Sequence, residues 1–330
     1  MTTNGTSFDG ARIFITGGAG FIGSHIADQL LAAGADRVVI LDDFIRGRME
    51  NLRAAQATGR LDVVTGDICD AALVDSLTEG ADFVFHQAAL RITQCAEEPV
   101  RAVQVMVTGT QNVLEAAVKH RVKKVLAASS ASVYGEPSHL PMDEGHPFNN
   151  RTLYGAAKIG NEQMLRSYAE MYGLNYLMLR PFNVYGPRMD VFGVYTEVMV
   201  RWLERLNEGK APVIFGDGLQ TMDFIYVEDL ARAYLLAAAS DQTDAVYNAG
   251  SGVETSLRTL CEMLCAAAGH PEVSPVFEAP RKVNPVTRRL AAIDAARTVI
   301  GFETTTTLAD GLRQLVEWHS AITRPMVAVS

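Results

Sequence analysis

Residues 16–23 read TGGAGFIG and lie between an apolar run at residues 12–15 and a stretch with the apolar spacing of a helix. A strand, a glycine-rich loop and a helix in this order place a pyrophosphate at the helix N-terminus. Gly17 permits the tight turn, Gly20 lets backbone N–H groups approach the phosphates, and Gly23 lets the helix pack close to the strand. The sequence therefore predicts a dinucleotide-binding loop, spaced G-x-x-G-x-x-G.

A second apolar run at residues 38–41 ends in Asp42. An acid at the tip of the second strand is placed to accept hydrogen bonds from an adenosine ribose. It also repels a 2′-phosphate, and Asp43 adds to that repulsion. Arg46 and Arg48 follow closely and leave NADP possible, but the balance of charge favours NAD as the cofactor.

The first half of the chain alternates between strand and helix patterns, which predicts an α/β fold with a doubly wound parallel sheet of the Rossmann type. The expected strands are residues 12–16, 38–41, 61–64, 83–86, 125–129 and 176–179, and the expected helices are 21–33, 100–120 and 154–172.

After residue 180 the alternation breaks into an irregular segment, followed by more elements. We expect helices at 196–207, 257–268 and 308–319 and strands at 212–215, 223–227 and 245–249. The domain prediction is an NAD-binding domain at 1–183, to which 222–250 returns, and a smaller mixed α/β domain at 184–221 and 251–330 that holds a nucleotide sugar.

Composition limits the function classes further. The 330 residues carry a net charge of −9, so a nucleic-acid partner has no electrostatic support. No apolar run has the length of a membrane span, and the polar N-terminal residues lack a signal segment. The four cysteines lack zinc-site spacing, so we expect no metal; Cys261 and Cys265 share a helix face as buried thiols. These features predict a cytoplasmic protein.

Tyr154 and Lys158 form a Y-x-x-x-K pattern at the start of a predicted helix, which places both on one face. A nearby lysine cation favours the phenolate and lowers the tyrosine pKa, so the tyrosine can act as a general base. The serine-rich segment at 129–135 follows a predicted strand, and its hydroxyls face the ligand crevice at the strand's carboxyl end. One of these hydroxyls can bond a substrate hydroxyl.

Several motifs together make the chain resemble the extended short-chain dehydrogenases/reductases, the group of NAD-dependent nucleotide-sugar epimerases and dehydratases. They are TGGAGFIG (16–23), LDD (41–43), GDI (66–68), HQAA (86–89), SSASVYG (129–135), YGAAK (154–158), LRPFNVYGP (179–187), GDG (216–218) and DFIYVEDLA (223–231).

The resemblance implies roles for individual residues. It implies a catalytic set of Ser130, Tyr154 and Lys158. It implies that the cofactor contacts Gly17, Gly20, Phe21, Ile22, Gly23, Asp42, Asp67, Ile68, Ala88, Ala89, Tyr154 and Lys158. The substrate residues that it suggests are Arg91, Ser130, Asn183 for the diphosphate, Arg188, Phe215 for stacking on the base, Arg281 and Arg289.

Ala131 and Ser132 decide between subfamilies. The dehydratases that this chain resembles carry an Asp-Glu pair there, and UDP-glucuronate decarboxylases carry a Glu at the position of Ser132. Without these acids, the resemblance favours an NAD-dependent 4-epimerase of a UDP-sugar of the glucose/galactose, N-acetylhexosamine or glucuronate type. A 4-keto-sugar reductase that consumes NAD(P)H is the alternative, followed by a catalytically silent NAD-binding regulator.

The chain also departs from the family pattern. Met222 stands where many relatives have a phosphate-binding Arg, so another cation must replace it, with Arg188, Arg281, Arg288 and Arg289 as candidates. A guanidinium in the sugar pocket would also pair with a uronic-acid carboxylate. The resemblance further implies a homodimer formed through the helices predicted at 100–120 and 154–172. The sequence does not distinguish UDP from dTDP.

Overall fold

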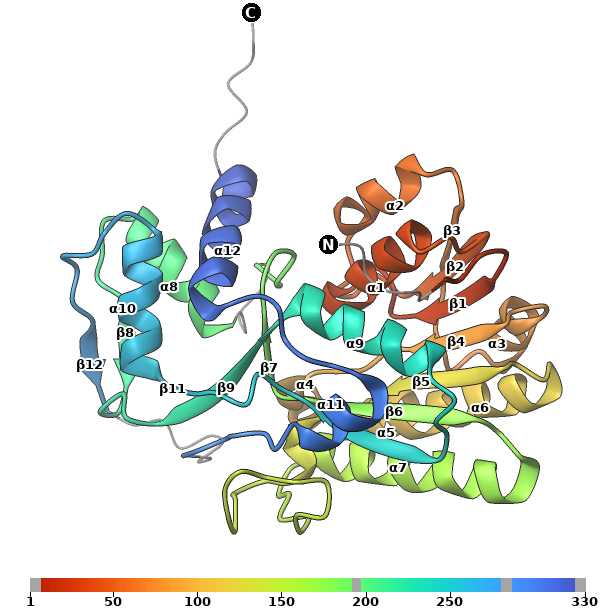
Figure 1. Cartoon of the computed structure of the whole chain (residues 1–330). Coiled ribbons are helices and arrows are strands. Elements are labelled where there is room, and N and C mark those ends of the chain that lie inside the picture. Colours follow the sequence, from red (N-terminus) through yellow and green to blue (C-terminus); the bar gives the residue numbers. More distant parts are fainter. Residues whose placement is uncertain (1–6, 192–196, 280–286, 324–330) are drawn as a thin grey trace, which may run out of the picture.

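A seven-stranded parallel sheet forms the larger part of the structure, a computed structural model that describes residues 7–191, 197–279 and 287–323 (Figure 1). Its strands are β1 (Arg12–Thr16), β2 (Arg37–Asp42), β3 (Leu61–Thr65), β4 (Phe83–His86), β5 (Lys124–Ala128), β6 (Tyr176–Pro181) and β10 (Ala245–Ala249). They lie in the order β10-β6-β5-β4-β1-β2-β3, and each neighbouring pair is parallel. The order reverses between β1 and β4, which is where such sheets bind ligands.

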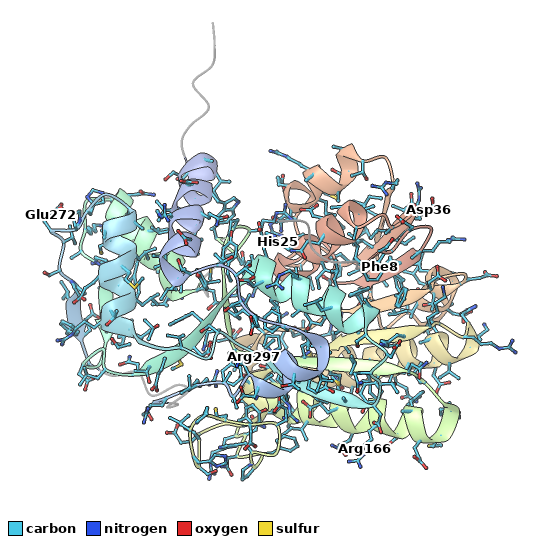
Figure 2. The ribbon with its side chains drawn as sticks, viewed as in Figure 1. Phe8, His25, Asp36, Arg166, Glu272 and Arg297 are labelled. Carbon is cyan, nitrogen blue, oxygen red and sulfur yellow. The ribbon has the colours of Figure 1, made fainter. Side chains whose placement is uncertain are left out.

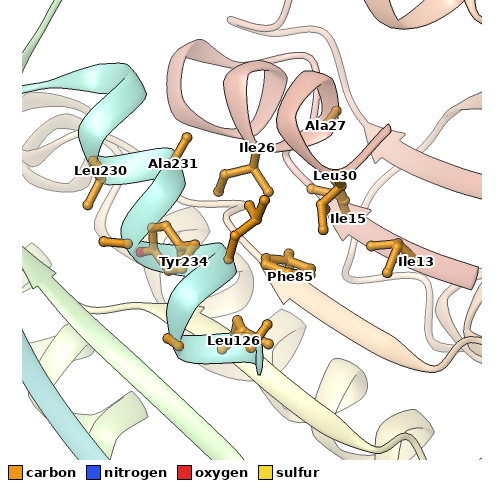
Figure 3. Close-up of a cluster of buried hydrophobic side chains, with 14 of the residues drawn as sticks. Ile13, Ile15, Ile26, Ala27, Leu30, Phe85, Leu126, Leu230, Ala231 and Tyr234 are labelled. Carbon is orange, nitrogen blue, oxygen red and sulfur yellow. The ribbon is translucent and has the colours of Figure 1, made fainter. Parts of the chain in front are cut away.

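Helices cover both faces of this sheet. One face carries α1 (Phe21–Ala32), the short α2 (Arg53–Ala57) after the 3₁₀ turn η1 (Met49–Leu52), α9 (Val227–Ala239) and α11 (Asp294–Ile300). Figure 3 shows Ile26 and Leu30 of α1 and Tyr234 of α9 meeting above Ile15 and Phe85 of the strands. All five side chains are fully buried, so this packing fixes α1, and with it the glycine-rich loop, against the sheet.

The opposite face carries α3 (Ala71–Thr78), α4 (Ile92–Glu97), α5 (Pro99–Val103), α6 (Thr110–Lys119) and α7 (Leu153–Tyr172). The helix predicted at 100–120 is present in three pieces, because a π-helical segment, η2 (Gln104–Gly109), joins α5 to α6. In this segment the Met106 sulfur accepts a hydrogen bond from the Leu90 N–H at 3.3 Å. The departure from α-helical pairing therefore lies beside the loop that follows β4.

The smaller lobe has its own hydrophobic core. It holds α8 (Val198–Asn207), α10 (Leu257–Ala267), α12 (Leu308–Thr323), the parallel pair β8 (Val213–Phe215) and β12 (Val276–Glu278), and a sheet of β7 (Asn183–Tyr185), β9 (Thr221–Tyr226) and β11 (Glu254–Ser256). Trp202 is buried at its centre, and its indole N–H donates to the Val213 carbonyl at 2.7 Å.

These observations confirm the predicted α/β fold class. Strand β10 pairs with β6 in the large sheet, whereas β9 lies in the three-stranded sheet. α11 packs on the large sheet's face although it comes late in the chain. The sequence pattern missed the short elements, including β7, β11, β12 and α11, because three to seven residues are too few for a periodic signal. No helix among the described residues is long and apolar enough to cross a bilayer.

Candidate active site

A cavity of about 1400 Å³ lies between the large sheet and the smaller lobe. Its lining includes nearly all the residues that the sequence analysis proposed for the cofactor and the substrate: Gly17, Gly20, Phe21, Ile22, Gly23, Asp42, Asp67, Ile68, Ala88, Ala89, Arg91, Ser130, Tyr154, Lys158, Asn183, Arg188 and Arg289. Segments far apart in the chain therefore meet at one site. Among the described residues, no group of His, Cys, Asp and Glu side chains is arranged to hold a metal ion.

The glycine-rich loop is packed so tightly that side chains cannot enter it. Gly17 has φ +69°, and a Cβ there would lie 2.7 Å from the Ala88 backbone nitrogen. A Cβ on Gly23 would lie 2.4 Å from the Gly17 carbonyl oxygen, so this glycine lets α1 approach the loop itself. Gly20 caps α1 without any side-chain hydrogen bond, which leaves the first N–H groups of the helix available to an anion. The loop thus fits a pyrophosphate.

Asp42 organises this loop from the end of β2. Its Oδ2 accepts a hydrogen bond from the Ala19 N–H and its Oδ1 accepts one from the Phe44 N–H, both at 2.9 Å. Burial raises the pKa of Asp42, and these two donors oppose the shift. The predicted contact with the ribose stays a prediction, and the structure adds a second task, which is to join the glycine-rich loop to the turn after β2.

Asp67 closes the same end of the cavity. Its carboxylate pairs with Arg101 and accepts the Cys69 N–H at 2.8 Å. These hydrogen bonds lower the pKa of Asp67 although partial burial opposes them. Its neighbour Ile68 packs beneath Gly109 of η2, where a Cβ would lie 2.6 Å from the isoleucine side chain.

The catalytic residues expected from sequence converge where β5 meets α7. Thr152 caps α7 by accepting the Gly155 N–H at 3.1 Å, which places Tyr154 and Lys158 in the first turns of the helix. The lysine Nζ lies 5.8 Å from the centre of the Tyr154 ring and donates to the Ala128 carbonyl at 2.6 Å. The Ser130 hydroxyl accepts the Ser132 N–H at 3.1 Å and also hydrogen-bonds the Tyr154 phenol.

The pKa values differ from the expectation that Lys158 lowers the pKa of Tyr154. Burial raises the pKa of Tyr154, and the hydrogen bond with Ser130 and the positive charge of Arg289 only partly oppose it. Burial also lowers the pKa of Lys158 to about 8. The expected lowering of the Tyr154 pKa was wrong for this structure. Spacing along a helix shows that two side chains are close, but it does not show how far the site is buried from water.

A buried ion pair lies next to the catalytic residues, and the sequence analysis did not identify it. Glu162 lies on α7, one turn beyond Lys158, and its carboxylate binds the Arg180 guanidinium in a bidentate pair at 2.7 and 2.8 Å. It also accepts a hydrogen bond from the Ser129 hydroxyl, next to Ser130. The i, i+4 spacing of Tyr154, Lys158 and Glu162 would have placed Glu162 on the same helix face, although it does not identify Arg180 as the partner.

The predicted substrate residues fall into different environments. Arg188 lines the cavity, yet its Nη2 lies 2.6 Å from Asp28 of α1. Figure 2 shows His25 on the side of α1 that faces the smaller lobe, where its Nε2 lies 3.0 Å from the Pro187 carbonyl oxygen. Arg91 faces Glu197 at 3.3 Å and Asp190 at 3.9 Å.

The remaining substrate predictions stay predictions. Asn183 donates to the Asp223 carbonyl at 2.9 Å and lines the cavity. Phe215 lies in β8 and is not among the residues that line the cavity. Arg281 lies outside the described residues. Arg289 lines the cavity close to Tyr154.

Comparison with known proteins identifies the family. The model of the NAD dependent epimerase/dehydratase family matches residues 13–250. This chain belongs to that family. Its cofactor is NAD, and the open α1 N-terminus, the packed glycines and the buried Asp42 fit it.

Relatives match along almost the whole chain. A UDP-glucose 4-epimerase of Mycolicibacterium smegmatis is 38% identical over 93% of this chain and 98% of its own. A putative UDP-glucose 4-epimerase of Methanocaldococcus jannaschii is 36% identical over 93% and 97%. The structure resembles a UDP-N-acetylglucosamine 4-epimerase of Methanobrevibacter ruminantium in complex with UDP-N-acetylmuramic acid, with TM-score 0.90, 33% identity and coverage of 95% and 99%.

Proposed function

We propose that this protein catalyses the NAD-dependent C4 epimerisation of a UDP-sugar through a transient 4-keto sugar. The observation that supports it best is the meeting of Ser130, Tyr154 and Lys158 in a cavity continuous with the glycine-rich loop. The neighbouring positions are Ala131 and Ser132, both buried, so the site lacks there the acids that elimination or decarboxylation would use.

The chain's own groups perform the acid–base chemistry. NAD, held by Gly17, Gly20 and Asp42, would supply a hydride acceptor for the first half of the reaction and a hydride donor for the second. Tyr154 takes the proton of the sugar C4 hydroxyl, assisted by the hydrogen bond from Ser130, and gives it back after the keto sugar has turned over in the pocket. Lys158, held by the Ala128 carbonyl, keeps a positive charge beside the phenol at neutral pH.

The test uses the purified protein with UDP-glucose, UDP-N-acetylglucosamine and UDP-glucuronate in separate tubes without added reductant. Proton NMR should reveal the anomeric signal of the C4 epimer in at least one tube. Products that form only with NADH and a 4-keto sugar would replace this proposal with the reductase. Absence of any turnover with these UDP-sugars, their dTDP counterparts or 4-keto sugars would favour a silent NAD-binding regulator.

Two further proposals concern the protein's setting. A homodimer through the helical stretch of α5, η2 and α6 and through α7 is supported by exposed apolar side chains, with Val100 73% and Met171 67% exposed. Residence in the reducing cytoplasm is supported by the cysteines, since all four are free thiols and Cys261 and Cys265 are buried as predicted. Sedimentation equilibrium of the full chain tests the dimer.

A further inference from the structure

Arg289 presents a positive charge to the active-site cavity without an anionic partner among the described residues. Within the part of the chain that the structure describes, its buried Nε has no hydrogen-bond partner, and its backbone N–H donates to the Thr221 carbonyl at 3.0 Å. Burial lowers its pKa, while the charges of Glu136 and Tyr154 act from farther away in the opposite direction. A guanidinium is always charged, so the site carries an uncompensated cation.

The other cavity arginines with ion pairs provide the contrast. Arg46 binds Asp190, Arg188 binds Asp28, and Arg91 lies near Asp190 and Glu197. A buried charge is unfavourable unless it is paired. Among the described residues, these three arginines have carboxylates within ion-pair distance and Arg289 has none, which indicates that a ligand supplies the missing anion.

The backbone holds Arg289 in place for this purpose. The segment 287–291 runs beside β9, and the Ala291 N–H donates to the buried Asp223 carboxylate at 3.1 Å. The preceding Arg288 points elsewhere and forms a bidentate pair with Glu254 at 2.6 and 2.7 Å. Alternation along an extended segment therefore sends one arginine to the surface and the next into the cavity.

The position of Arg289 limits where the anion sits on the sugar. Arg289 and Tyr154 line the same cavity, and the positive charge of Arg289 acts on the phenol that the proposed function assigns to the C4 hydroxyl. The groups next to C4 on a pyranose are those on C3 and C5. The diphosphate is attached at C1, across the ring from C4.

We propose that Arg289 is a specificity residue that binds a carboxylate attached next to C4, so that the preferred substrates are acidic nucleotide sugars. Two sources offer this chemistry: the C6 carboxylate of a uronic acid, and an acid carried on the C3 oxygen. Arg289 suits either, because its planar fork pairs with a carboxylate through two parallel hydrogen bonds. This inference rests on the proposed function, which places C4 at Tyr154.

The experiment compares kcat/KM for UDP-glucuronate, UDP-N-acetylmuramate and UDP-glucose in the wild type and in Arg289→Gln, Arg289→Lys and the control Arg288→Gln. We expect Arg289→Gln to reduce kcat/KM for the preferred acidic sugar by about 10- to 100-fold relative to UDP-glucose, the range of a charged bidentate pair. Arg289 also affects the pKa of Tyr154, and this effect is the same for every substrate. It therefore cancels in the ratio of kcat/KM for the acidic sugar to kcat/KM for UDP-glucose. Arg289→Lys should recover part of the loss, and Arg288→Gln should leave the ratio unchanged.

Binding measurements separate this inference from the proposed function. Calorimetry measures the affinities for UDP-glucuronate, UDP-N-acetylmuramate, UDP-glucose and UDP. These affinities show whether Arg289 binds the carboxylate or the diphosphate. Equal weakening of all four in Arg289→Gln, or a wild type that prefers UDP-glucose, overturns the inference and leaves epimerisation intact. Selective, Arg289-dependent binding of an acidic sugar without formation of the C4 epimer overturns the epimerase and supports the inference.

Discussion

Replacing Glu162 by Gln tests how much the buried Glu162–Arg180 ion pair contributes to stability and to the pH dependence of the active site. The Glu162 and Arg180 side chains are 3% and 5% exposed, so their ion pair is screened from water. The variant removes the negative charge and places an NH₂ group where one carboxylate oxygen accepts from the guanidinium. The other hydrogen-bond partners of Arg180 among the described residues are neutral, the Tyr134 hydroxyl at 2.8 Å and the Glu144 carbonyl at 3.0 Å.

The size of the effect follows from the burial. Breaking a buried ion pair from one side costs about 3–5 kcal/mol, because the other charge stays buried without compensation. With an unfolding entropy of about 2.1 cal/mol/K per residue over 330 residues, the loss corresponds to a fall in Tm of about 4–7 °C. Glu162 also raises the pKa of Lys158. In the variant this pKa should fall, so the alkaline limb of the pH profile of kcat should shift to lower pH.

Thermal unfolding of the holoenzyme measures the first effect, and a pH profile of kcat measures the second. Glu170→Gln is the matched control, since it makes the same change at an exposed position of α7 and should alter stability by less than about 0.5 kcal/mol. The double variant Glu162→Leu, Arg180→Met should regain most of the loss, because it removes both charges of the pair. A Tm for Glu162→Gln within 1 °C of the control would refute the reasoning.

Three further predictions concern catalysis, the cofactor loop and pH. Tyr154→Phe should fold, retain NAD and reduce kcat by at least about 100-fold; an unchanged kcat would exclude its acid–base role. Gly17→Ala should abolish NAD retention, measured by absorbance of the purified protein, because its Cβ would meet the Ala88 backbone at 2.7 Å, whereas Gly59→Ala, with φ +71° and open space, should retain NAD. Burial and Lys158 lower the pKa of His86 to about 3. The unfolded chain therefore binds a proton that the folded protein excludes, and urea unfolding should show a loss of about 2 kcal/mol from this histidine between pH 7.5 and 5, which His86→Asn removes.

Much of the fold was predictable because its signals are local. The central strands β1, β2, β4 and β5 of the large sheet are largely buried apolar runs, and α7 shows a Thr cap at Thr152 and a left-handed Gly173 at its end. The π-helical segment around Met106 was not predictable, because its apolar pattern is also that of an ordinary helix. The return of α11 to the large sheet was missed as well, since Ala296 and Ile300 find their partners through tertiary packing.

The sequence by itself determined the cofactor loop and the fold class, because short-range spacing of glycines and apolar residues encodes them. The family resemblance implied most of the other predicted residues that line the cavity. Only the tertiary structure decided which charges are compensated. Arg188 meets Asp28 160 residues away in the chain, and Glu162 of α7 meets Arg180 of the strand β6; the local sequence identifies neither pair. The same long-range packing leaves Arg289 facing the cavity. It also buries Tyr154 enough to raise its pKa, because burial depends on how the smaller lobe packs against the large sheet.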